Sequence, residues 1–169
     1  MTLEKDQFLS LILENKKIIY KICHAYCGNL EDRKDLEQEI IIQLWQAADR
    51  YDTQYKLSTW IYRISLNVAI SFLRKEKSRK QYVTQADQSI IERFEDQSES
   101  DHLEANIKRL YHFINQFDKL SCALMILYLD DHPYKEIAEI LGISETNVAT
   151  KISRIKQQLK REFHAERNV

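Results

Sequence analysis

The feature that most constrains this chain is its scarcity of turn-forming residues. Its 169 residues include only two glycines and one proline. Average proteins contain about 7% glycine and about 5% proline, and folds built from many short strands need both residues in their turns. We therefore expect an all-α fold. The length is enough for one medium-sized domain or two small ones.

Apolar residues recur at helical spacing through the first 80 residues. The pattern predicts three helices with these buried faces: Phe8, Leu9, Ile12, Leu13, Ile18, Ile19 and Ile22 in the first; Leu36, Ile40, Leu44 and Ala47, broadened by Ile41 and Trp45, in the second; Ile61, Ile64, Val68 and Phe72 in the third. Gly28 and Asn29 end the first helix, and Asp32 and Ser58 are expected to cap the next two. Three such helices predict a bundle with its own core.

Residues 81–105 interrupt this periodicity. From Gln81 to Asn106 there are seven acidic residues and a single basic one, Arg93. A segment rich in Gln, Ser, Asp and Glu buries too little apolar surface to offset its ordering entropy. We therefore predict two small helical domains, residues 1–80 and 106–169, joined by a flexible acidic linker at 81–105. In the second domain, Leu110, Ile114 and Phe117, then Leu120, Leu124 and Leu127, predict two helices.

The segment from Tyr134 to Lys156 has the pattern of a helix-turn-helix. Ile137, Ala138 and Leu141 form the apolar face of a short first helix. Gly142 follows where a positive φ closes the turn, and Ser144 can cap the second helix. The buried face of that second helix is expected to hold Val148, Ile152, Ile155 and Leu159. An ordinary helical hairpin with a solvated face is the alternative interpretation.

The outer face of that second helix is polar and cationic. It carries Thr146, Asn147, Thr150, Lys151 and Arg154, whose side chains can donate to phosphates and base edges. No acidic residue intervenes between Glu145 and Glu162. The segment therefore favours DNA binding.

The predicted second helix carries an acidic and amide patch beside apolar residues, in Asp35-Leu36-Glu37-Gln38-Glu39 and nearby Trp45. Such a patch suits docking onto a basic helical partner. It could instead be a solvated face stabilised by pairs with Arg33 and Lys34. A carboxylate metal site for hydrolysis is a third interpretation, weakened by the absence of a Glu-x-x-His pairing.

The predicted third helix combines aromatic and basic residues. Trp60, Tyr62 and Phe72 alternate with Arg63 and with a run of five Arg or Lys in residues 74–80, although the whole chain has a net charge of only -1. Arg63, Asn67, Ser71 and Arg74 fall on one helical stripe, next to Lys75. Such a stripe can bind a separated DNA strand through phosphates, bases and stacking. Alternatively, Trp60 and Phe72 are core residues and the basic cluster is a solvated helix end.

The remaining residue types restrict the other classes of function. Cys23 and Cys27 flank His24, but further metal ligands are lacking, so we interpret both cysteines as small buried hydrophobes and expect no metal or other cofactor. Neither a membrane span nor a secretory segment is evident, and three cysteines suit a reducing compartment. A cytoplasmic location follows. The sequence contains no nucleophile-base pair or phosphate loop, so an enzyme is not expected.

Together these segments resemble the extracytoplasmic-function (ECF) group of the bacterial sigma-70 family, over nearly the whole chain. Residues 35–39 are similar to that family's core-polymerase-binding helix. Residues 58–69, Ser-Thr-Trp-Ile-Tyr-Arg-Ile-Ser-Leu-Asn-Val-Ala, are similar to its promoter-melting and −10-reading segment. Residues 134–156 are similar to its −35-reading helix-turn-helix. The order and spacing of the three motifs make the resemblance specific.

The resemblance implies a sigma factor that directs transcription initiation, and it assigns roles residue by residue. Asp35, Leu36, Gln38, Glu39 and Trp45 would bind core RNA polymerase. Trp60, Arg63, Asn67, Ser71, Arg74 and Lys75 would contact the −10 element, with Asn67 at an extruded base and Arg63 and Arg74 on the strand backbone. Thr146, Asn147, Thr150, Lys151 and Arg154 would face the −35 major groove. Core polymerase, promoter DNA and an anti-sigma factor are the implied partners, with no small-molecule substrate.

A second class of function fits part of the same pattern. A helix-turn-helix regulator or helical adaptor would use the C-terminal segment without acting as a polymerase subunit. Such a protein would not need both the patch at Asp35 and the polar stripe from Arg63. Transcription by purified core polymerase separates the two classes.

Overall fold

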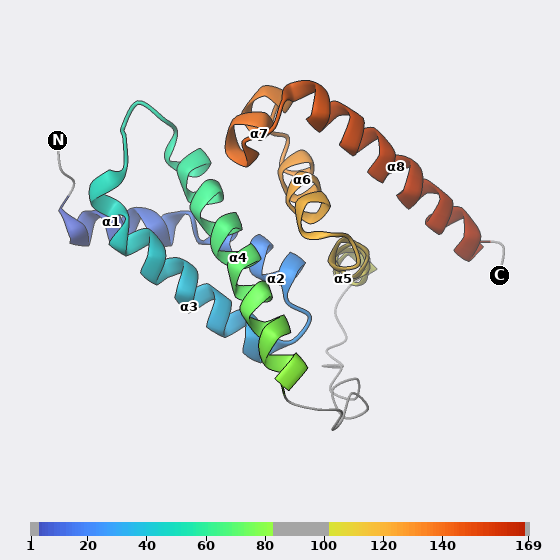
Figure 1. Ribbon diagram of the computed structural model, residues 1–169, viewed down its shortest axis with the longest axis horizontal. Helices are drawn as coiled ribbons and strands as arrows, with labels where there is room; N and C mark the ends of the chain where they lie inside the picture. Colours follow the sequence, from blue (N-terminus) through green and yellow to red (C-terminus); the bar gives the residue numbers. More distant parts are fainter. Residues whose placement is uncertain (1–3, 83–101, 168–169) are drawn as a thin grey trace.

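The protein is all-helical in the computed structural model, which describes residues 4–82 and 102–167. The helices are α1 (Lys5–Glu14), α2 (Lys16–Tyr26), α3 (Leu30–Gln46), the short 3-10 helix η1 (Ala48–Arg50), α4 (Leu57–Tyr82), α5 (His102–Asn115), α6 (Lys119–Leu129), α7 (Tyr134–Leu141) and α8 (Glu145–Arg167). Figure 1 shows α1–α4 on one side of the molecule and α5–α8 on the other. No strand occurs within those residues, and the predicted fold class is confirmed.

The N-terminal group of helices packs around α3 and α4. α3 lies against α4, α2 and α1. Leu36, Ile40 and Leu44 on α3 are fully buried, as are Phe8 and Ile12 on α1. These residues recur every third or fourth position, so each helix buries one continuous face.

The first predicted helix is divided in two at Asn15. The backbone of Asn15 has φ -96° and ψ 17°, and its N–H donates to the carbonyls of Leu11 and Ile12. Its side-chain Nδ2 also donates to the Leu11 carbonyl at 2.9 Å. Asn15 therefore caps α1, and α2 departs in a new direction. Leu9 and Leu13, which were predicted on the buried face, are 36% and 53% exposed.

Two helix starts differ by a few residues from the expectation. Asn29, not Asp32, is the N-cap of α3, because its Oδ1 accepts from the Asp32 N–H at 2.8 Å. The Asp32 carboxylate accepts from Asn29 Nδ2 at 2.6 Å instead. α4 begins at Leu57, so Ser58 lies inside the first turn rather than at its cap. Shifts of this size are common where several polar residues compete to cap a helix.

The C-terminal group is built around α6. Six consecutive residues, Cys122 to Leu127, are buried because α2 and α5 as well as α7 and α8 pack around this helix. Asp118 caps α6 by accepting from the N–H groups of Leu120 and Ser121, each at 3.1 Å. Burial raises the pKa of the Cys122 thiol to about 12, so this cysteine serves as a small hydrophobe.

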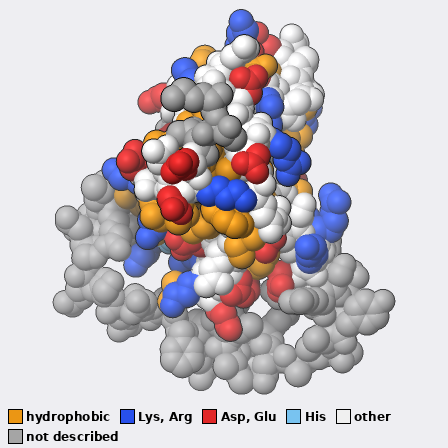
Figure 2. Space-filling view, turned by 90° about the vertical axis from the view of Figure 1, so that its left-hand side faces the viewer, with side chains coloured by type: hydrophobic (Ala, Val, Ile, Leu, Met, Phe, Trp, Pro, Cys, Tyr) orange, Lys and Arg blue, Asp and Glu red, His pale blue; other side chains and the backbone are white. Residues whose placement is uncertain are grey.

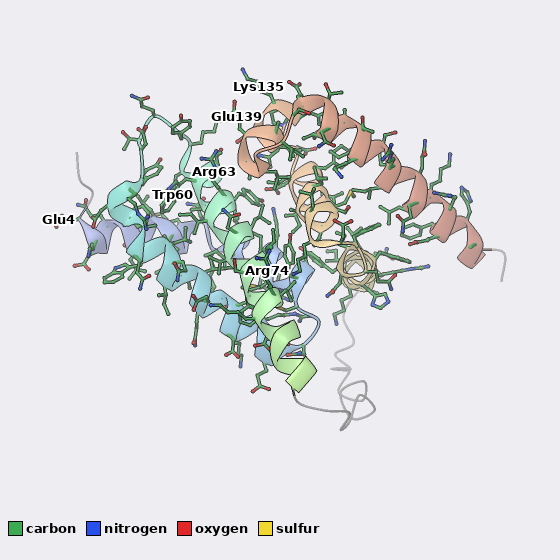
Figure 3. The ribbon with its side chains drawn as sticks, in the orientation of Figure 1. Glu4, Trp60, Arg63, Arg74, Lys135 and Glu139 are labelled. Atoms are coloured by element: carbon green, nitrogen blue, oxygen red, sulfur yellow. The ribbon has the colours of Figure 1, made fainter. Side chains whose placement is uncertain are left out.

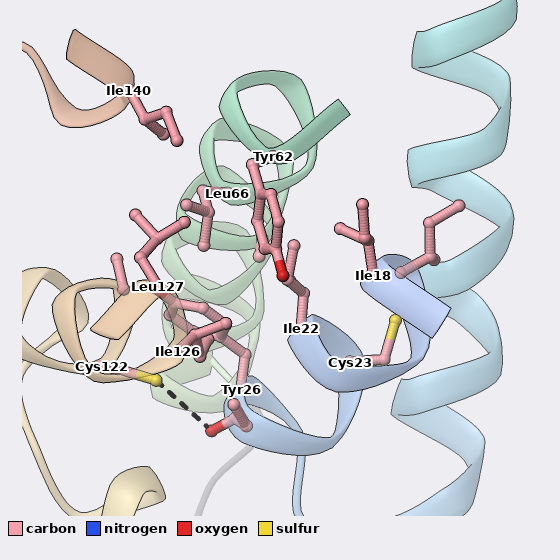
Figure 4. Packing of buried hydrophobic residues seen from close by; sticks show 14 of the residues in the cluster. Ile18, Ile22, Cys23, Tyr26, Tyr62, Leu66, Cys122, Ile126, Leu127 and Ile140 are labelled. Carbon is pink, nitrogen blue, oxygen red and sulfur yellow. Dashed lines mark hydrogen bonds between the residues drawn. The ribbon is translucent and has the colours of Figure 1, made fainter. Parts of the chain in front are cut away.

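The two groups of helices share one hydrophobic core. α2 packs against α5 and α6, and α4 packs against α7. Tyr62, Leu66 and Ala69 of α4 are almost completely buried, and Figure 4 shows Tyr62 and Leu66 lying between α2 and the residues of α6 and α7. The sequence pattern predicted only Ile61, Ile64, Val68 and Phe72 on the inner face. Ile61 is fully buried as predicted, whereas Ile64, Val68 and Phe72 are only partly buried. The buried face of α4 is displaced toward Tyr62, Leu66 and Ala69 because helices cover that side as well.

The predicted linker lies mostly outside the described residues. α4 extends to Tyr82 and α5 begins at His102, so both ends of the predicted segment 81–105 are helical. Residues 83–101 are not described. Cys23 and Cys27 are buried as predicted, at 3% exposure each.

Candidate nucleic-acid interface

The helix-turn-helix has the predicted geometry. α7 ends at Gly142, which has φ +68°, and the N–H groups of Gly142 and Ile143 both donate to the Ala138 carbonyl. This closes the turn in the left-handed conformation that glycine adopts without strain. Ser144 Oγ then accepts from the Asn147 N–H at 3.1 Å, which caps α8. Val148, Ile152 and Ile155 are buried, so the outer face of α8 is fixed.

The predicted polar residues of α8 lie on that outer face. Thr146, Asn147, Thr150 and Arg154 are exposed, and Lys151 is half-buried. The Thr150 hydroxyl donates to the Thr146 carbonyl at 3.0 Å. Burial raises the pKa of Asp118, but hydrogen bonds from Ser121 and Leu120, and to a smaller extent the charge of Lys151, keep it below its ordinary value. Arg154 is thus the most openly presented cation of this set.

The predicted stripe on α4 is also present. Arg63, Asn67, Ser71 and Arg74 are all exposed, and so is Lys75. Figure 3 shows Arg63 near the start of α4 beside α7, and Arg74 further along the same helix. The side chains of residues 77–82 are not described, so the rest of the basic run lies outside the described residues.

Trp60 belongs to an aromatic cluster rather than to the free surface. Its ring centroid lies 5.4 Å from that of Phe8 on α1 and 5.3 Å from that of Tyr51. These contacts leave Trp60 half-buried. The cluster joins the start of α4 to α1 and to the segment after η1, so Trp60 fixes the direction in which the α4 stripe is presented.

The first part of the α4 stripe contacts α7. Arg63 Nη2 donates to the backbone carbonyl of Glu139 at 2.9 Å. One turn earlier, Thr59 Oγ1 donates to Glu136 Oε1 at 2.5 Å. Figure 3 shows Arg63 and Glu139 close together where α4 meets α7. This contact was not predicted from the sequence, because nothing in the local pattern of α4 indicates which helix packs against it.

A polar network continues the contact between the two groups of helices. Asp130, at the end of α6, accepts a hydrogen bond from the Tyr62 hydroxyl and pairs with the Lys21 ammonium of α2. His132 lies edge-on to the Tyr62 ring, with centroids 4.9 Å apart. Its Nε2 is 3.6 Å from Asp130 Oδ2 and its Nδ1 is 3.3 Å from Glu136 Oε2. Charged and aromatic groups of both halves therefore meet in one place.

The two carboxylates of this network are held in their ionised form. Burial raises the pKa of Asp130, but hydrogen bonds from Lys21 and Tyr62 outweigh it and keep the pKa below its ordinary value. Glu136 behaves in the same way. Burial raises its pKa, while hydrogen bonds from Thr59 and His132 lower it by more. Both carboxylates are therefore charged at neutral pH.

Part of the predicted docking patch lies on an exposed stripe of α3. Asp35 and Gln38 are exposed, and Ile42 and Trp45 follow on the same face at 47% and 41% exposure. Glu39 is half-buried and accepts from Gln43 Nε2 at 3.0 Å. Lys5 Nζ lies 4.7 Å from the centroid of the Trp45 ring. Figure 2 looks onto the end of the molecule where α1 begins and shows hydrophobic side chains exposed among charged ones.

Two details of this patch differ from the expectation. Leu36 is fully buried, so it positions α3 and cannot contact a partner in this conformation. Ile42 was not predicted as part of the patch. Its signal was available, because Asp35, Gln38, Ile42 and Trp45 advance by three, four and three residues along one helical face.

Within residues 4–82 and 102–167 no group of three or more His, Cys, Asp or Glu side chains could hold a metal ion. None of the described helices is long and apolar enough to cross a membrane. The exposed polar surfaces of the described residues lie on α3, α4 and α8.

Comparisons with known proteins identify both halves of the chain. Residues 11–79 match the family model described as Sigma-70 region 2, and residues 114–159 match Sigma-70, region 4. The ECF RNA polymerase sigma factor SigM of Bacillus subtilis (strain 168) is 30% identical over 144 residues, which cover 84% of this chain and 86% of SigM. SigW of the same strain, also an ECF RNA polymerase sigma factor, is 27% identical over 169 residues, covering 95% of this chain and 90% of SigW.

Two solved structures have the same fold. One is CnrH in complex with the cytosolic domain of CnrY, with a TM-score of 0.68 and 18% identity, covering 96% of this chain and 90% of CnrH. The other is the sigma factor RpoE in complex with the anti-sigma factor NepR from Bartonella quintana, with a TM-score of 0.68 and 19% identity, covering 93% of this chain and 96% of RpoE. At these identities the likeness concerns the fold alone.

Proposed function

The chain belongs to the ECF group of the sigma-70 family of RNA polymerase sigma factors, and we propose that it directs initiation through three separate surfaces. One surface binds core polymerase, one binds the −10 element and one binds the −35 element. A single observation carries this proposal: three exposed polar stripes lie on α3, α4 and α8, each backed by fully buried apolar residues of the same helix. Rigid backing of this kind holds a binding surface in a defined geometry.

The α3 stripe is the proposed docking surface for core polymerase. Asp35, Gln38 and Glu39 supply acceptors for basic groups, and Ile42 and Trp45 supply apolar area beside them. An interface of this composition combines an apolar anchor with electrostatic steering. The alternative of a merely solvated face does not account for two large exposed hydrophobic side chains on the same stripe.

The α4 stripe is the proposed −10 surface. Asn67 and Ser71 can bond to base edges of a separated strand, while Arg63, Arg74 and Lys75 neutralise its phosphates. Trp60 stabilises the start of the helix that presents this surface, because its ring packs against Phe8 and Tyr51. On α8, Thr146, Asn147, Thr150 and Lys151 are near the N-terminal turns of a helix that can enter a major groove, and Arg154 lies further along for a phosphate.

Several wider features belong to the same proposal. We assign residues 1–80 to the core-binding and −10 functions, 106–169 to the −35 function, and 81–105 to the connection between them. An anti-sigma factor is a proposed partner, supported by the RpoE–NepR complex that shares this fold. The proposed place of action is the cytoplasm, where core polymerase and promoter DNA are found. The protein acts as a polymerase subunit and not as an enzyme itself.

The experiment that tests this function is transcription with purified core polymerase on fragmented genomic DNA, followed by sequencing of the RNA 5′ ends. We expect discrete start sites, absent with core polymerase alone, that share two conserved upstream elements. A helix-turn-helix regulator would give starts only when another sigma factor is added. Failure to direct any new start with core polymerase would contradict the proposal.

A further inference from the structure

Three aromatic rings lie in a row on α2 and the adjoining side of α5. The rings of Tyr20 and His24, one helical turn apart on α2, have centroids 3.7 Å apart and planes inclined by 31°. The ring of Tyr111 on α5 follows, with its centroid 5.9 Å from that of His24. α2 packs against both α3 and α5 (Figure 1). This aromatic row therefore spans the contact between α2 and α5.

The first ring of the aromatic row is open to solvent. Tyr20 is 57% exposed. A single exposed tyrosine is common on protein surfaces, but this one continues a stack, because the His24 ring lies against it. Internal packing thus uses one face of the Tyr20 ring, and the exposed fraction of the side chain leaves room for a further planar group to extend the stack.

Lysines border the aromatic row on both helices. Lys16 and Lys17 precede Tyr20 by four and three residues on α2. Lys108 precedes Tyr111 by three residues on α5. Residues at these separations lie on the same side of a helix, and all three lysines are exposed. Because α2 contains no acidic residue, the surface combines stacked rings with cations from two helices.

The carboxylates that act on the aromatic row each have a cation opposing them. Asp130 acts on the ring from α5, but its charge is balanced by the Lys21 ammonium. Glu37 is half-buried on α3 and acts on His24, where the charge of Arg33 opposes it. The three exposed lysines therefore determine the sign of this surface, which is positive.

His24 presents a hydrogen-bond acceptor beside the stack. Its Nδ1 lies 2.9 Å from the Tyr20 carbonyl, which can only accept, so Nδ1 carries the proton. Burial lowers the pKa of His24 by more than this hydrogen bond raises it, so the imidazole is neutral at pH 7. In the neutral ring Nε2 is unprotonated and can accept a hydrogen bond from a hydroxyl group.

We propose that the aromatic row, together with its bordering lysines, binds single-stranded RNA. Proteins commonly bind an unpaired strand by stacking its bases on exposed aromatic rings and placing its phosphates on neighbouring cations. RNA is favoured over DNA because its 2′-hydroxyl can donate to His24 Nε2, and DNA has no such donor. The inference goes beyond the proposed function, since none of these residues belongs to the stripes on α3, α4 or α8.

The first test measures binding of the full chain to a short labelled RNA of mixed sequence by fluorescence anisotropy. Tyr20→Ala removes the exposed ring, and Tyr20→Phe retains it. Tyr55→Ala is the matched control, because Tyr55 is 58% exposed but lies after η1, outside the aromatic row. We expect roughly tenfold weaker binding for Tyr20→Ala, which is the effect of losing one stacked base. Tyr20→Phe and Tyr55→Ala should bind like the parent.

A second pair of variants tests the lysines across a salt series. Lys16→Ala with Lys17→Ala should reduce the slope of log affinity against log salt by about one unit, because each phosphate contact of a single strand contributes about 0.7. Lys135→Ala with Lys160→Ala removes the same charge from exposed residues of α7 and α8 and should leave the slope close to the parent's. Equal changes for the two pairs would show general electrostatic attraction and would overturn a site on α2.

A DNA of the same sequence separates this inference from the proposed −10 surface. Tyr20→Ala should weaken binding of the RNA more than binding of the DNA, whereas Asn67→Ala on the α4 stripe should weaken binding of the DNA more. A loss of RNA affinity for Tyr20→Ala no larger than that for Tyr55→Ala would overturn the proposal. An equal loss on RNA and DNA would overturn the assignment of RNA as the ligand.

Discussion

At the scale of the residue, several side chains proposed to contact DNA already have intramolecular partners. Arg63 donates to the Glu139 carbonyl, the Thr150 hydroxyl donates to the Thr146 carbonyl, and the charge of Lys151 acts on the Asp118 carboxylate. When these side chains contact DNA, they must first break their intramolecular interactions. Each DNA contact therefore contributes less to the free energy of binding than the number of contacts alone would suggest.

Lys151 and Arg154 should differ in what they contribute to −35 binding. Lys151 projects near the first turns of α8, where a groove-inserted helix meets base edges, and Arg154 lies one turn further along. Lys151→Ala should lower discrimination between a matched and a scrambled −35 element by ~1–3 kcal/mol. Arg154→Ala should weaken binding to both and reduce the salt slope by about one unit.

The measurement is the affinity of holoenzyme for the two promoters across a salt series. Lys160→Ala, an exposed cation later on α8, is the control for loss of charge alone. The full chain is used instead of the C-terminal group alone, because α5 and α6 of that group pack against α2. Equal losses on matched and scrambled elements for Lys151→Ala would show that Lys151 does not read sequence.

The two interface carboxylates predict a pH dependence of stability. The pKa values of Asp130 and Glu136 are lower in the folded protein than their ordinary values. Their contribution is therefore fully present above the unfolded pKa of about 4 and is lost as pH falls through the lower folded values. The free energy of unfolding, measured with urea from pH 7 to pH 3, should fall less steeply for Asp130→Asn with Glu136→Gln. Identical slopes in the variant and the parent would contradict this linkage.

At the scale of the element, the turn between α7 and α8 sets the angle at which α8 is presented. Gly142 has φ +68°, and an added Cβ there would meet nothing within 4 Å. Gly142→Ala should therefore destabilise the protein by about 1–2 kcal/mol through backbone strain alone. Gly28→Ala is the control, because Gly28 has no positive φ and its added Cβ would make only a van der Waals contact at 3.9 Å. Urea unfolding measures both, and equal effects would refute the strain argument.

Some helices and turns were predictable from the sequence and others were not. The helix-turn-helix was predictable in detail because Gly142, Ser144 and the apolar positions of α8 act within a few residues of one another. The break at Asn15 was not, since the apolar spacing continues from Ile12 to Ile18 and Ile19 while the polar side chain of Asn15 ends α1. A polar capping residue can end a helix even where the apolar spacing continues. The spacing of apolar residues alone therefore does not predict where the helix ends.

At the scale of the whole molecule, the sequence predicted two helical groups but not their contact. Tyr62 illustrates the reason. Its position among Trp60, Arg63 and Phe72 suggested an aromatic near DNA, whereas its ring is buried and its hydroxyl bonds to Asp130, 68 residues away in the sequence. A contact over that separation leaves no periodic signal. The exposed stripes were easier to predict, because each depends on the spacing within one helix.

The central claim is that α3 docks this chain onto core polymerase, and charge reversal on α3 tests it most directly. Asp35→Lys with Glu39→Lys places two cations on the docking stripe, while Glu14→Lys with Glu145→Lys makes the same charge change on α1 and α8. Affinity for purified core polymerase is measured by titration, with helicity checked by circular dichroism. We predict a loss of ~2–5 kcal/mol for the α3 pair and little change for the control. Assembly of the helical α3 variant at the parent's affinity would contradict the account.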